Sequence, residues 1–391
     1  MISELERHAE DMFRERFETP PHVPAFAPRR LAVLGNHTDH NEGYVVSAAT
    51  HVGTLFGAAP APDASNQCVV VAADLSRTAR FPLDDLSPRT EEPWANYVIG
   101  VTAGLAELKP FDRGYRALVT SNLPMGAGLS SSAAIELSSA LALARLNGLN
   151  PQPRALAMIA QRAEHDFVGV RCGLLDQFTS LFGTENSLVL TDFRSLEVEQ
   201  VPLSEDARFL MCDTAVTHSL VDGQYNERRK HCEEARDALA ALLGRPVAAL
   251  RDVSEAELRQ HASSLDPVAA RRAAHVVGEN ARVLKGRDCL ASGDLEGFGR
   301  LMFESHESSI RNFENSCPEL DFVVATARKL PGVLGARLSG GGFGGSAAIL
   351  IHARDAETGA QALSSAYLKQ FNRPCTCRTL VPSAGAALLS P

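Results

Sequence analysis

The sequence lacks a Cys-x-x-Cys pair, a long apolar run and a surplus of positive charge. Its eight cysteines are scattered, so no zinc-binding spacing is present and we expect free thiols in a reducing cytoplasm. No segment approaches the roughly 18–20 apolar residues that span a membrane, and residues 2–17 predict an amphipathic helix with acidic residues rather than an export signal. The net charge of −9 argues against nucleic acid as a partner. We therefore expect a cytoplasmic enzyme with small-molecule partners.

Lysine is absent from the most informative segment, residues 121–134, which reads Ser-Asn-Leu-Pro-Met-Gly-Ala-Gly-Leu-Ser-Ser-Ser-Ala-Ala. Backbone N–H groups at the start of a helix, preceded by glycines, form a site for phosphate. Without lysine, the segment is not the Gly-x-x-x-x-Gly-Lys-Ser/Thr loop of common nucleotide-binding proteins. The structural alternative is a helix start rich in capping residues, but three consecutive serines exceed what capping requires.

The order of predicted elements indicates an α+β protein of two domains, residues 1–203 and 204–391. Strands and helices alternate in the first part, charged helices dominate residues 223–310, and strands return near the end. The predicted strands are 31–34, 45–55, 69–73, 115–120, 188–192, 209–213, 335–338 and 347–351. The predicted helices outside 223–310 are 2–17, 94–106, 131–147 and 153–167.

A second motif lies at residues 27–43, where a short strand leads into a polar turn with Asn36, His37, Asp39 and His40. Amides, imidazoles and carboxylates packed so closely suit a hydroxyl-rich ligand such as a sugar. The alternative is a turn that is merely hydrogen-bonded to itself, and a single histidine is more often structural than catalytic.

A third motif, residues 337–346, contains five glycines within six residues. It includes Gly-x-Gly-x-x-Gly, but residues 346–351 predict a strand and not the helix that a dinucleotide fingerprint requires. So many glycines indicate a backbone that approaches something closely, although a flexible surface turn would also tolerate them.

Together, the segments 28–43, 123–134 and 337–346 resemble the three motifs of the galactokinase branch of the GHMP kinases. Shorter blocks at 94–101, 172–180 and 305–321 are also similar to that family. The resemblance covers nearly the whole chain. It implies a two-domain fold of mixed sheets covered by helices, with the active site in the cleft between the domains. It also implies ATP-dependent phosphorylation of the C1 hydroxyl of a galacto-configured hexose, and a monomer or weak dimer.

The resemblance also implies a role for individual residues. Asp176 would face the C1 hydroxyl with Arg30 beside it, and Ser132 and Glu164 would bind Mg²⁺. The residues implied in sugar binding are Asn36, His37, Asp39, Gly173 and Tyr225. Those implied in binding ATP are Trp94, Pro124, Gly126, Ala127, Gly128, Leu129, Ser130, Ser131, Ser132, Gly341 and Gly342. The alternatives are that Trp94 is an ordinary core residue and that Asp176 or Glu164 is a surface charge without a function.

One departure from the family concerns the choice of sugar. Asn36 stands where the galactokinase signature has a glutamate that accepts a hydrogen bond from the 6-hydroxyl, and His40 stands where it has a tyrosine. A neutral amide tolerates a carboxylate at C6, and plant galacturonokinases are similar in both positions. We expect galactose as the acceptor, with galacturonate as the alternative. A non-catalytic sugar sensor is less expected, because Arg30, Asp176, Glu164 and Ser132 are all present. Mevalonate or homoserine kinase is disfavoured, because the several polar side chains of this turn exceed what a small alcohol with one carboxylate would need.

Overall fold

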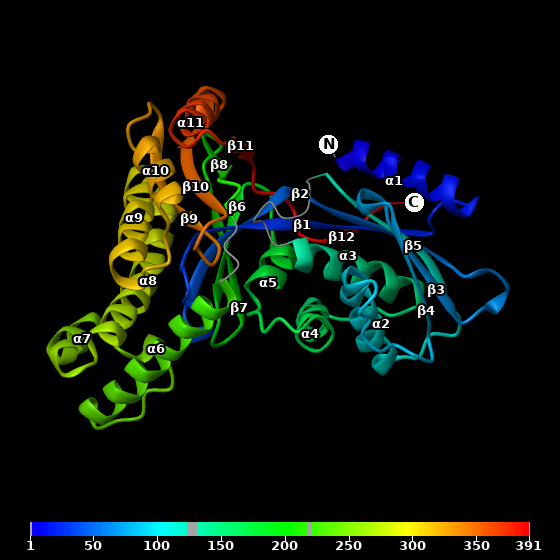
Figure 1. Ribbon diagram of the computed structural model, residues 1–391, viewed down its shortest axis with the longest axis horizontal. Coiled ribbons are helices and arrows are strands. Elements are labelled where there is room, and N and C mark those ends of the chain that lie inside the picture. The colour runs from blue at the N-terminus through cyan, green and yellow to red at the C-terminus, as the bar shows by residue number, and fades with distance from the viewer. Residues whose placement is uncertain (1, 123–130, 217–220, 391) are drawn as a thin grey trace. The chain divides into compact units, whose positions relative to one another are not determined.

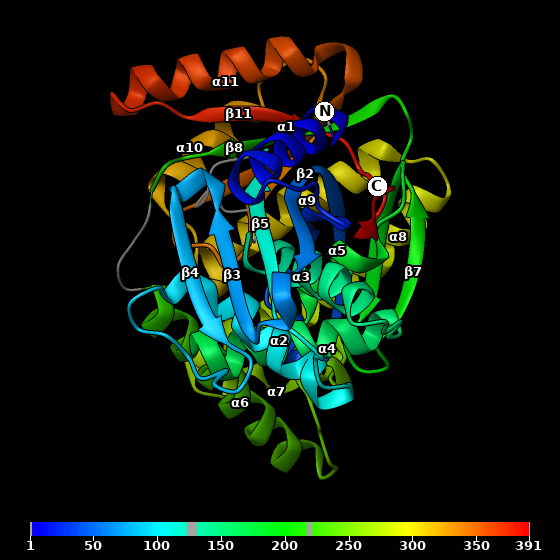
Figure 2. The same ribbon diagram turned by 90° about the vertical axis from the view of Figure 1, so that its right-hand side faces the viewer.

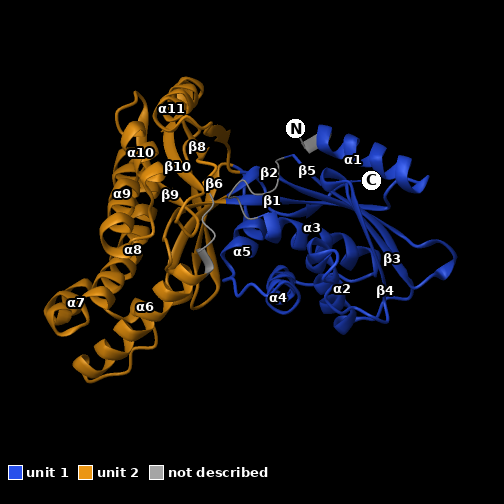
Figure 3. Cartoon of the chain, viewed as in Figure 1, with its two compact units in different colours: residues 1–30, 49–185, 383–391 blue, residues 31–48, 186–382 orange. Residues whose placement is uncertain are grey.

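The computed structural model describes residues 2–122, 131–216 and 221–390 of the chain, which divide into two compact units (Figure 3). The first unit contains residues 1–30, 49–185 and 383–391, and the second contains 31–48 and 186–382. The expected domain boundary between residues 203 and 204 divides the chain once, whereas each of these units is made of separate stretches of chain. The boundary therefore stays a prediction.

The first unit is a sheet with helices on both faces (Figure 1). The strand order is β12-β1-β2-β5-β3-β4. β3 and β5 pair in parallel, whereas β12 with β1, β2 with β5 and β3 with β4 pair antiparallel. β1 and β2 continue beyond Arg30 and before Ala49 into the second unit. The elements are α1 (Ile2–Phe17), β1 (Val23–Leu34), β2 (Tyr44–Pro60), β3 (Gln67–Ala72), β4 (Arg77–Pro82), α2 (Asn96–Leu108), β5 (Tyr115–Ser121), α3 (Ser131–Leu146), α4 (Pro153–Ala163), α5 (Leu175–Phe182) and β12 (Ala387–Leu388).

Alternating side chains of the strands form two separate cores in this unit. Phe26 and Leu55 pack with Phe13 of α1 on one face, whereas Ala27 and Phe56 pack with α2, α3 and α4 on the other. Because successive side chains of a strand point to opposite faces, both faces of the sheet are apolar here, and the long strands β1 and β2 are buried along almost their whole length.

The second unit joins a four-stranded antiparallel sheet, in the order β11-β8-β10-β9, to a group of long helices. Its strand β6 pairs with β7 and with Tyr44–Ser47 of β2. The elements are β6 (Ser187–Asp192), β7 (Glu197–Pro202), β8 (Ala207–Asp213), α6 (Val221–Leu243), α7 (Glu255–His261), α8 (Pro267–Ala291), α9 (Leu295–Ser308), α10 (Pro318–Ala327), β9 (Val333–Ser339), β10 (Ser346–His352), α11 (Ala356–Phe371) and β11 (Thr376–Leu380).

Helices α10 and α11 cover one face of this sheet. Leu320 and Leu363 pack there against Leu210 of β8 and Ile349 of β10. The strands β8 and β11, which contact α11, are seen beside it in Figure 2. The glycine-rich segment 340–345 is the connection between β9 and β10, so the sheet fixes both of its ends.

The predicted α+β architecture is confirmed, but its expected elements were too few and too short. Strand 31–34 is the end of the longer β1, and β4, β7, β11 and β12 were not predicted at all. The exposed and half-buried residues of β7 and β11 explain this, because strands at the margin of a sheet carry little apolar signal. The predicted helix 153–167 ends at Ala163 and continues as a single π-helical turn, Glu164–Val168.

The expectation of free thiols is wrong for one pair. Cys212 on β8 lies opposite Cys377 on β11 in the strand ladder, and the two form a disulfide. The contact follows from strand pairing across 165 residues, which cysteine spacing cannot show. Within 2–122, 131–216 and 221–390, no helix has the length and apolar character needed to cross a membrane.

Candidate active site

Arg30 and Asp176 form an ion pair in the first unit. Arg30 ends the part of β1 that belongs to this unit, and Asp176 lies in the first turn of α5. The Nε of Arg30 donates to Oδ1 of Asp176 at 2.5 Å. Arg30 is buried, and its Nη1 has no hydrogen-bond partner among the residues that the structure describes. The pair therefore combines a charge-compensated carboxylate with an unused guanidinium donor.

A second group of side chains surrounds Glu164, which begins the π-helical turn after α4. Single π-turns inserted in helices are frequent at functional sites. The thiol of Cys172 donates to Oε2 of Glu164 at 3.2 Å, and the hydroxyl of Ser132 is also hydrogen-bonded to Glu164. Ser132 is in the first turn of α3. The two residues expected to bind a metal are thus in contact with each other.

Glu136 adds a second buried carboxyl group beside Glu164. The Nε2 of Gln177 lies 3.1 Å from Oε2 of Glu136 and 3.5 Å from Oε2 of Glu164. Burial raises the pKa of Glu164, and it raises the pKa of Glu136 well above its usual range. The negative charges of Glu164 and Asp176 raise the pKa of Glu136 further. Two carboxyl groups sharing a dry site are stabilised by a cation, and hydroxyl and carboxylate oxygens are the ligands that Mg²⁺ prefers. The residues present therefore fit this ion.

In the second unit, the polar turn after β1 is held by a buried acid that sequence reasoning missed. Oε1 of Glu279, on α8, accepts the backbone N–H groups of Gly35 at 3.1 Å and Asn36 at 3.0 Å. The same oxygen accepts the hydroxyl of Ser305 at 2.6 Å. A ring nitrogen of His275, Nε2, lies 3.1 Å from the carbonyl oxygen of Asn36. Both backbone groups of Asn36 are therefore fixed by α8.

The side-chain amide of Asn36 is also held at both ends. Its Nδ2 donates to the carbonyl of Gly340 at 2.7 Å, and its Oδ1 accepts from Nδ2 of Asn315 at 2.9 Å. Asn315 follows a second π-helical turn, Ser309–Phe313, that continues α9. One N–H and one lone pair of Asn36 remain for another partner.

His37 adopts a left-handed backbone conformation, with φ of +59°, which is uncommon outside glycine and clusters at functional sites. Its Nε2 lies 3.0 Å from the carbonyl oxygen of Gly341. Burial lowers the pKa of His37 to about 3, so the ring is neutral near pH 7. Because a carbonyl can only accept, Nε2 carries the proton and Nδ1 is left as an acceptor.

Asp39, His40 and Tyr225 lie around His37. Burial acts to raise the pKa of Asp39, but hydrogen bonds from His40 and the nearby imidazoles lower it to about 2. Nδ1 of His40 lies 3.3 Å from Oδ1 of Asp39 and 3.5 Å from the hydroxyl of Tyr225. The ring of Tyr225 packs on His37 with centroids 5.1 Å apart. The structure thus brings Asn36, His37, Asp39 and Tyr225 together.

The glycine-rich segment 340–345 packs against the same turn through its carbonyl groups. Gly342 has a φ of +86°, and a Cβ there would lie 2.1 Å from the backbone oxygen of Asn315. Gly341 accepts hydrogen bonds from both His37 and Asn315, yet a Cβ on it would meet nothing within 4 Å. The close approach that the glycines indicated is therefore real, and Gly342 is one position that requires it.

Other predicted residues are not joined to these groups. Trp94 is half-buried beside the core of the first unit, and its Nε1 donates to Oε2 of Glu92 at 2.5 Å. Gly173 lies in the bend before α5. Pro124, Gly126, Ala127, Gly128, Leu129 and Ser130 lie outside the described residues, whereas Ser131 begins α3.

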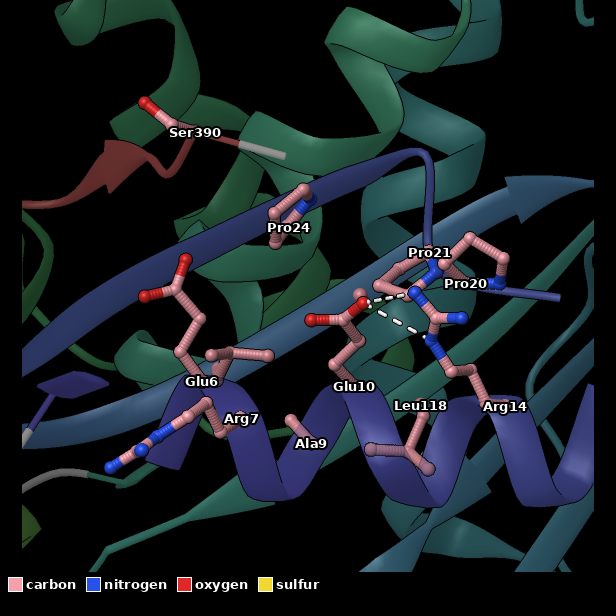
Figure 4. A pocket seen from close by; sticks show the side chains of 12 residues that line it. Glu6, Arg7, Ala9, Glu10, Arg14, Pro20, Pro21, Pro24, Leu118 and Ser390 are labelled. Carbon is pink, nitrogen blue, oxygen red and sulfur yellow. Dashed lines mark hydrogen bonds and ion pairs between the residues drawn. The ribbon is translucent and has the colours of Figure 1, made fainter. Parts of the chain in front are cut away.

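A pocket of about 690 Å³ in the first unit is separate from these motifs. It opens between α1 and the strands β1, β2 and β5 and is lined by Pro20, Pro21 and Leu118 (Figure 4). Glu10 and Arg14 pair at its rim. None of the residues predicted for the active site lines it, so it gives no support to that prediction and has no assigned role.

Sequence reasoning missed Glu136, Gln177, Glu279, His275 and Asn315. Glu136 had a usable signal, because it follows Ser132 by four residues and so lies one turn further on the same helix face. Glu279 and His275 also lie four residues apart, on α8, but nothing local links them to residues 35 and 36. Their role depends on contacts between segments that are distant in the sequence.

Comparison with known proteins supports the family resemblance of the sequence. The galactokinase galactose-binding signature matches residues 11–60, and the N-terminal and C-terminal domains of the GHMP kinases match residues 96–184 and 287–369. A galactokinase of Roseiflexus sp. is 39% identical over 366 residues, covering 94% of this chain and 93% of its own length. The human galactokinase is 39% identical over 359 residues, covering 90% and 89%.

The crystal structure of Lactococcus lactis galactokinase complexed with galactose superposes with a TM-score of 0.92 at 30% identity. The match covers 98% of this chain and all of that one. The GHMP-kinase fold expected from the sequence is therefore confirmed. The chain belongs to the GHMP kinases and, within them, to the galactokinase family, whose members are ATP-dependent sugar kinases.

Proposed function

We propose that this protein transfers the γ-phosphoryl group of ATP to the C1 hydroxyl of galactose. The observation that carries the proposal is the ion pair of Arg30 with Asp176, whose unused Nη1 donor can meet a phosphoryl oxygen. Catalysis of phosphoryl transfer consists mainly of positioning and charge stabilisation. The carboxylate of Asp176 can position the hydroxyl, and the guanidinium of Arg30 beside it can stabilise the charge.

Each member of the pair has its own task in the proposed reaction. The C1 oxygen of the sugar attacks the γ-phosphorus, the bond from that phosphorus to the bridging oxygen of ADP breaks, and the hydroxyl proton passes to Asp176. Arg30 orients the carboxylate and donates to the oxygens on which charge develops. Either a full proton transfer or orientation of the hydroxyl is compatible with this geometry.

Ser132 and Glu164 would bind Mg²⁺. Gln177 lies next to both Glu164 and Glu136 and would hold these side chains in place. A bound Mg²⁺ neutralises charge on the β- and γ-phosphates. Ser131 and Ser132 begin α3, so the N–H groups of the first turn are available to a phosphate oxygen. For the remaining residues predicted to bind ATP, from Pro124 to Ser130 together with Trp94, Gly341 and Gly342, the support is the family resemblance.

The sugar hydroxyls would meet Asn36, His37, Asp39 and Tyr225, with Gly173 contributing from the loop before α5. Asp39 is ionised and His37 presents neutral Nδ1 as an acceptor, so both can accept hydrogen bonds from hydroxyls. Galacturonate is the second candidate, favoured by one observation. Asn36 keeps a free N–H that could donate to a carboxylate at C6, which a glutamate there would repel.

A coupled assay of ADP release with galactose, galacturonate, N-acetylgalactosamine and glucuronate tests the acceptor. We expect the largest kcat/KM for galactose. A larger value for galacturonate would make the uronate the substrate. The Asn36→Glu variant should then shift the ratio towards galactose by about 10-fold or more, since like charges placed side by side cost several kcal/mol and about 1.4 kcal/mol is tenfold.

Replacing Asp176 with Asn tests the proposed mechanism. The amide keeps the shape of the side chain but cannot take a proton, so we expect kcat to fall by about 10²–10⁴ while KM for ATP changes little. Circular dichroism and the melting temperature serve as controls for folding. An Asp176→Asn protein with wild-type turnover would refute this role.

A cytoplasmic location and a monomeric or weakly dimeric state stay predictions.

A further inference from the structure

Three cysteine sulfurs meet in the second unit, and none of them has a role in the proposed reaction. Cys212 lies on β8, Cys377 lies opposite it on β11, and Cys375 precedes β11 by one residue. Residues two apart in an extended segment point to the same side. The three Sγ atoms all lie within 4.8 Å of one another, and those of Cys375 and Cys377 are 3.9 Å apart.

The cluster lies at the boundary of an apolar core. Cys212 and Cys375 are buried and Cys377 is half-buried, and Leu210, Leu363 and Tyr367 belong to the same core. The disulfide accounts for Cys212 and Cys377 but not for the third thiol. Burial and the nearby Asp213 raise the pKa of Cys375 to about 12, so this thiol is a poor nucleophile for exchange with the disulfide.

We propose that the reduced cluster of Cys212, Cys375 and Cys377 is a binding site for one thiophilic d¹⁰ cation, Zn²⁺ or Cu⁺. Soft thiolate ligands select these two ions. Two sulfurs bound to one zinc at about 2.3 Å in tetrahedral geometry are about 3.8 Å apart, close to the separation of Cys375 and Cys377. Each thiol that binds the cation releases its proton, and the disulfide form, with two sulfurs joined, cannot bind it.

Charge and coordination distinguish the two cations. Three thiolates with Zn²⁺ carry a net charge of −1, and a water molecule on the half-exposed side of Cys377 would complete four-coordination. Three thiolates with Cu⁺ carry −2 and need no fourth ligand. The experiment therefore uses both ions separately.

A cation bound at this site would link the edge strand β11 to its neighbour β8. β11 pairs only with β8 among the described strands, and the cluster connects the start of β11 to the interior of the sheet. A cation that binds only the folded form stabilises it by RT ln(1 + L/Kd), where L is the cation concentration, so the melting temperature rises with the logarithm of L over Kd. Binding should therefore be visible as thermal stabilisation as well as by direct titration.

The test uses the full chain reduced by a phosphine, stripped with a chelator and kept free of oxygen. Zn²⁺ and Cu⁺ are each titrated in competition with a chromophoric chelator, and the melting temperature is followed in parallel. We expect one cation per chain. Cys375→Ser should weaken binding at least 10-fold and reduce the thermal shift measured at the same cation concentration. Cys289→Ser, which removes a thiol on α8, is the matched control and should bind as the wild type does.

Several outcomes would overturn the proposal. These are no binding of either ion by the reduced wild type, equal binding by Cys375→Ser, or an equal loss in Cys289→Ser. Equal binding by protein whose disulfide is intact would also contradict it. If Cys375→Ser does not fold, as judged by circular dichroism, the half-exposed Cys377→Ser replaces it with the same expectation.

Discussion

At the scale of single residues, Glu279 shows how charge is balanced inside the second unit. Burial alone would raise its pKa, but Arg282 and Arg337 lower it far below the usual range. The Nε of Arg282 donates to Oε2 of Glu279 at 2.7 Å. Arg337 is fully buried without a described hydrogen-bond partner for its guanidinium, so it acts on Glu279 through its charge. The ionised carboxylate is what allows the N–H groups of Gly35 and Asn36 to be held together.

His275 predicts a pH dependence of stability. Burial lowers its pKa to about 4, whereas the unfolded chain titrates near 6.5. The unfolded state therefore binds the proton first, and stability is lost as the pH falls from about 6.5 towards 4. Between pH 7.5 and 5 we expect a loss of about 2 kcal/mol from this residue, measured by denaturant unfolding.

Two variants separate His275 from the other titrating groups. His275→Gln should show a smaller loss of stability between the two pH values, and His22→Gln, at an exposed position, should match the wild type. An unchanged pH dependence in His275→Gln would contradict the assignment.

At the scale of elements, the connection between β9 and β10 can be tested at neighbouring glycines. Gly342→Ala introduces a Cβ that clashes with Asn315 at a positive φ, whereas Gly341→Ala meets open space. We expect Gly342→Ala to cost about 1–3 kcal/mol locally and to raise KM for galactose about 10-fold, with Gly341→Ala near the wild type. Steady-state kinetics with galactose as the varied substrate provide the measurement, and equal KM values for the two variants would refute the expected difference.

Elements with a strong local signal were predictable from the sequence. Helix 131–147 was expected and α3 spans Ser131–Leu146, because the serines that start it and the glycine that follows it are local features. β7 and β11 were missed, since their half-exposed residues resemble loops. The polar turn at residues 36–40 was predicted as a sugar site, and that stays a prediction. The contacts that hold the turn to α8 were not predicted, because Glu279 lies more than 240 residues away in the sequence. Long-range pairing also explains the missed disulfide.

At the scale of the whole molecule, the end of the described chain completes the first unit. Leu388 and Ala387 of β12 pair with Ala25 and Phe26 of β1, and the N–H of Ala386 donates to the carbonyl of Ser180 at 2.7 Å. We expect removal of residues 383–391 to destabilise the protein by about 1–3 kcal/mol, measured as a fall in melting temperature. Leu388→Ala, at a side chain that is 42% exposed, should cost less than about 0.5 kcal/mol. Equal melting temperatures for the truncated and full chains would contradict this expectation.

The same arrangement has a consequence for synthesis on the ribosome. The segment 383–391 emerges only after the whole of 186–382, although it belongs with residues made at the start. Domains usually fold in order as they emerge, but here the margin of β1 that pairs with β12 stays exposed until residues 383–391 have been made. A chaperone that shields exposed strand edges would therefore be needed longest by the part of the protein that is made first.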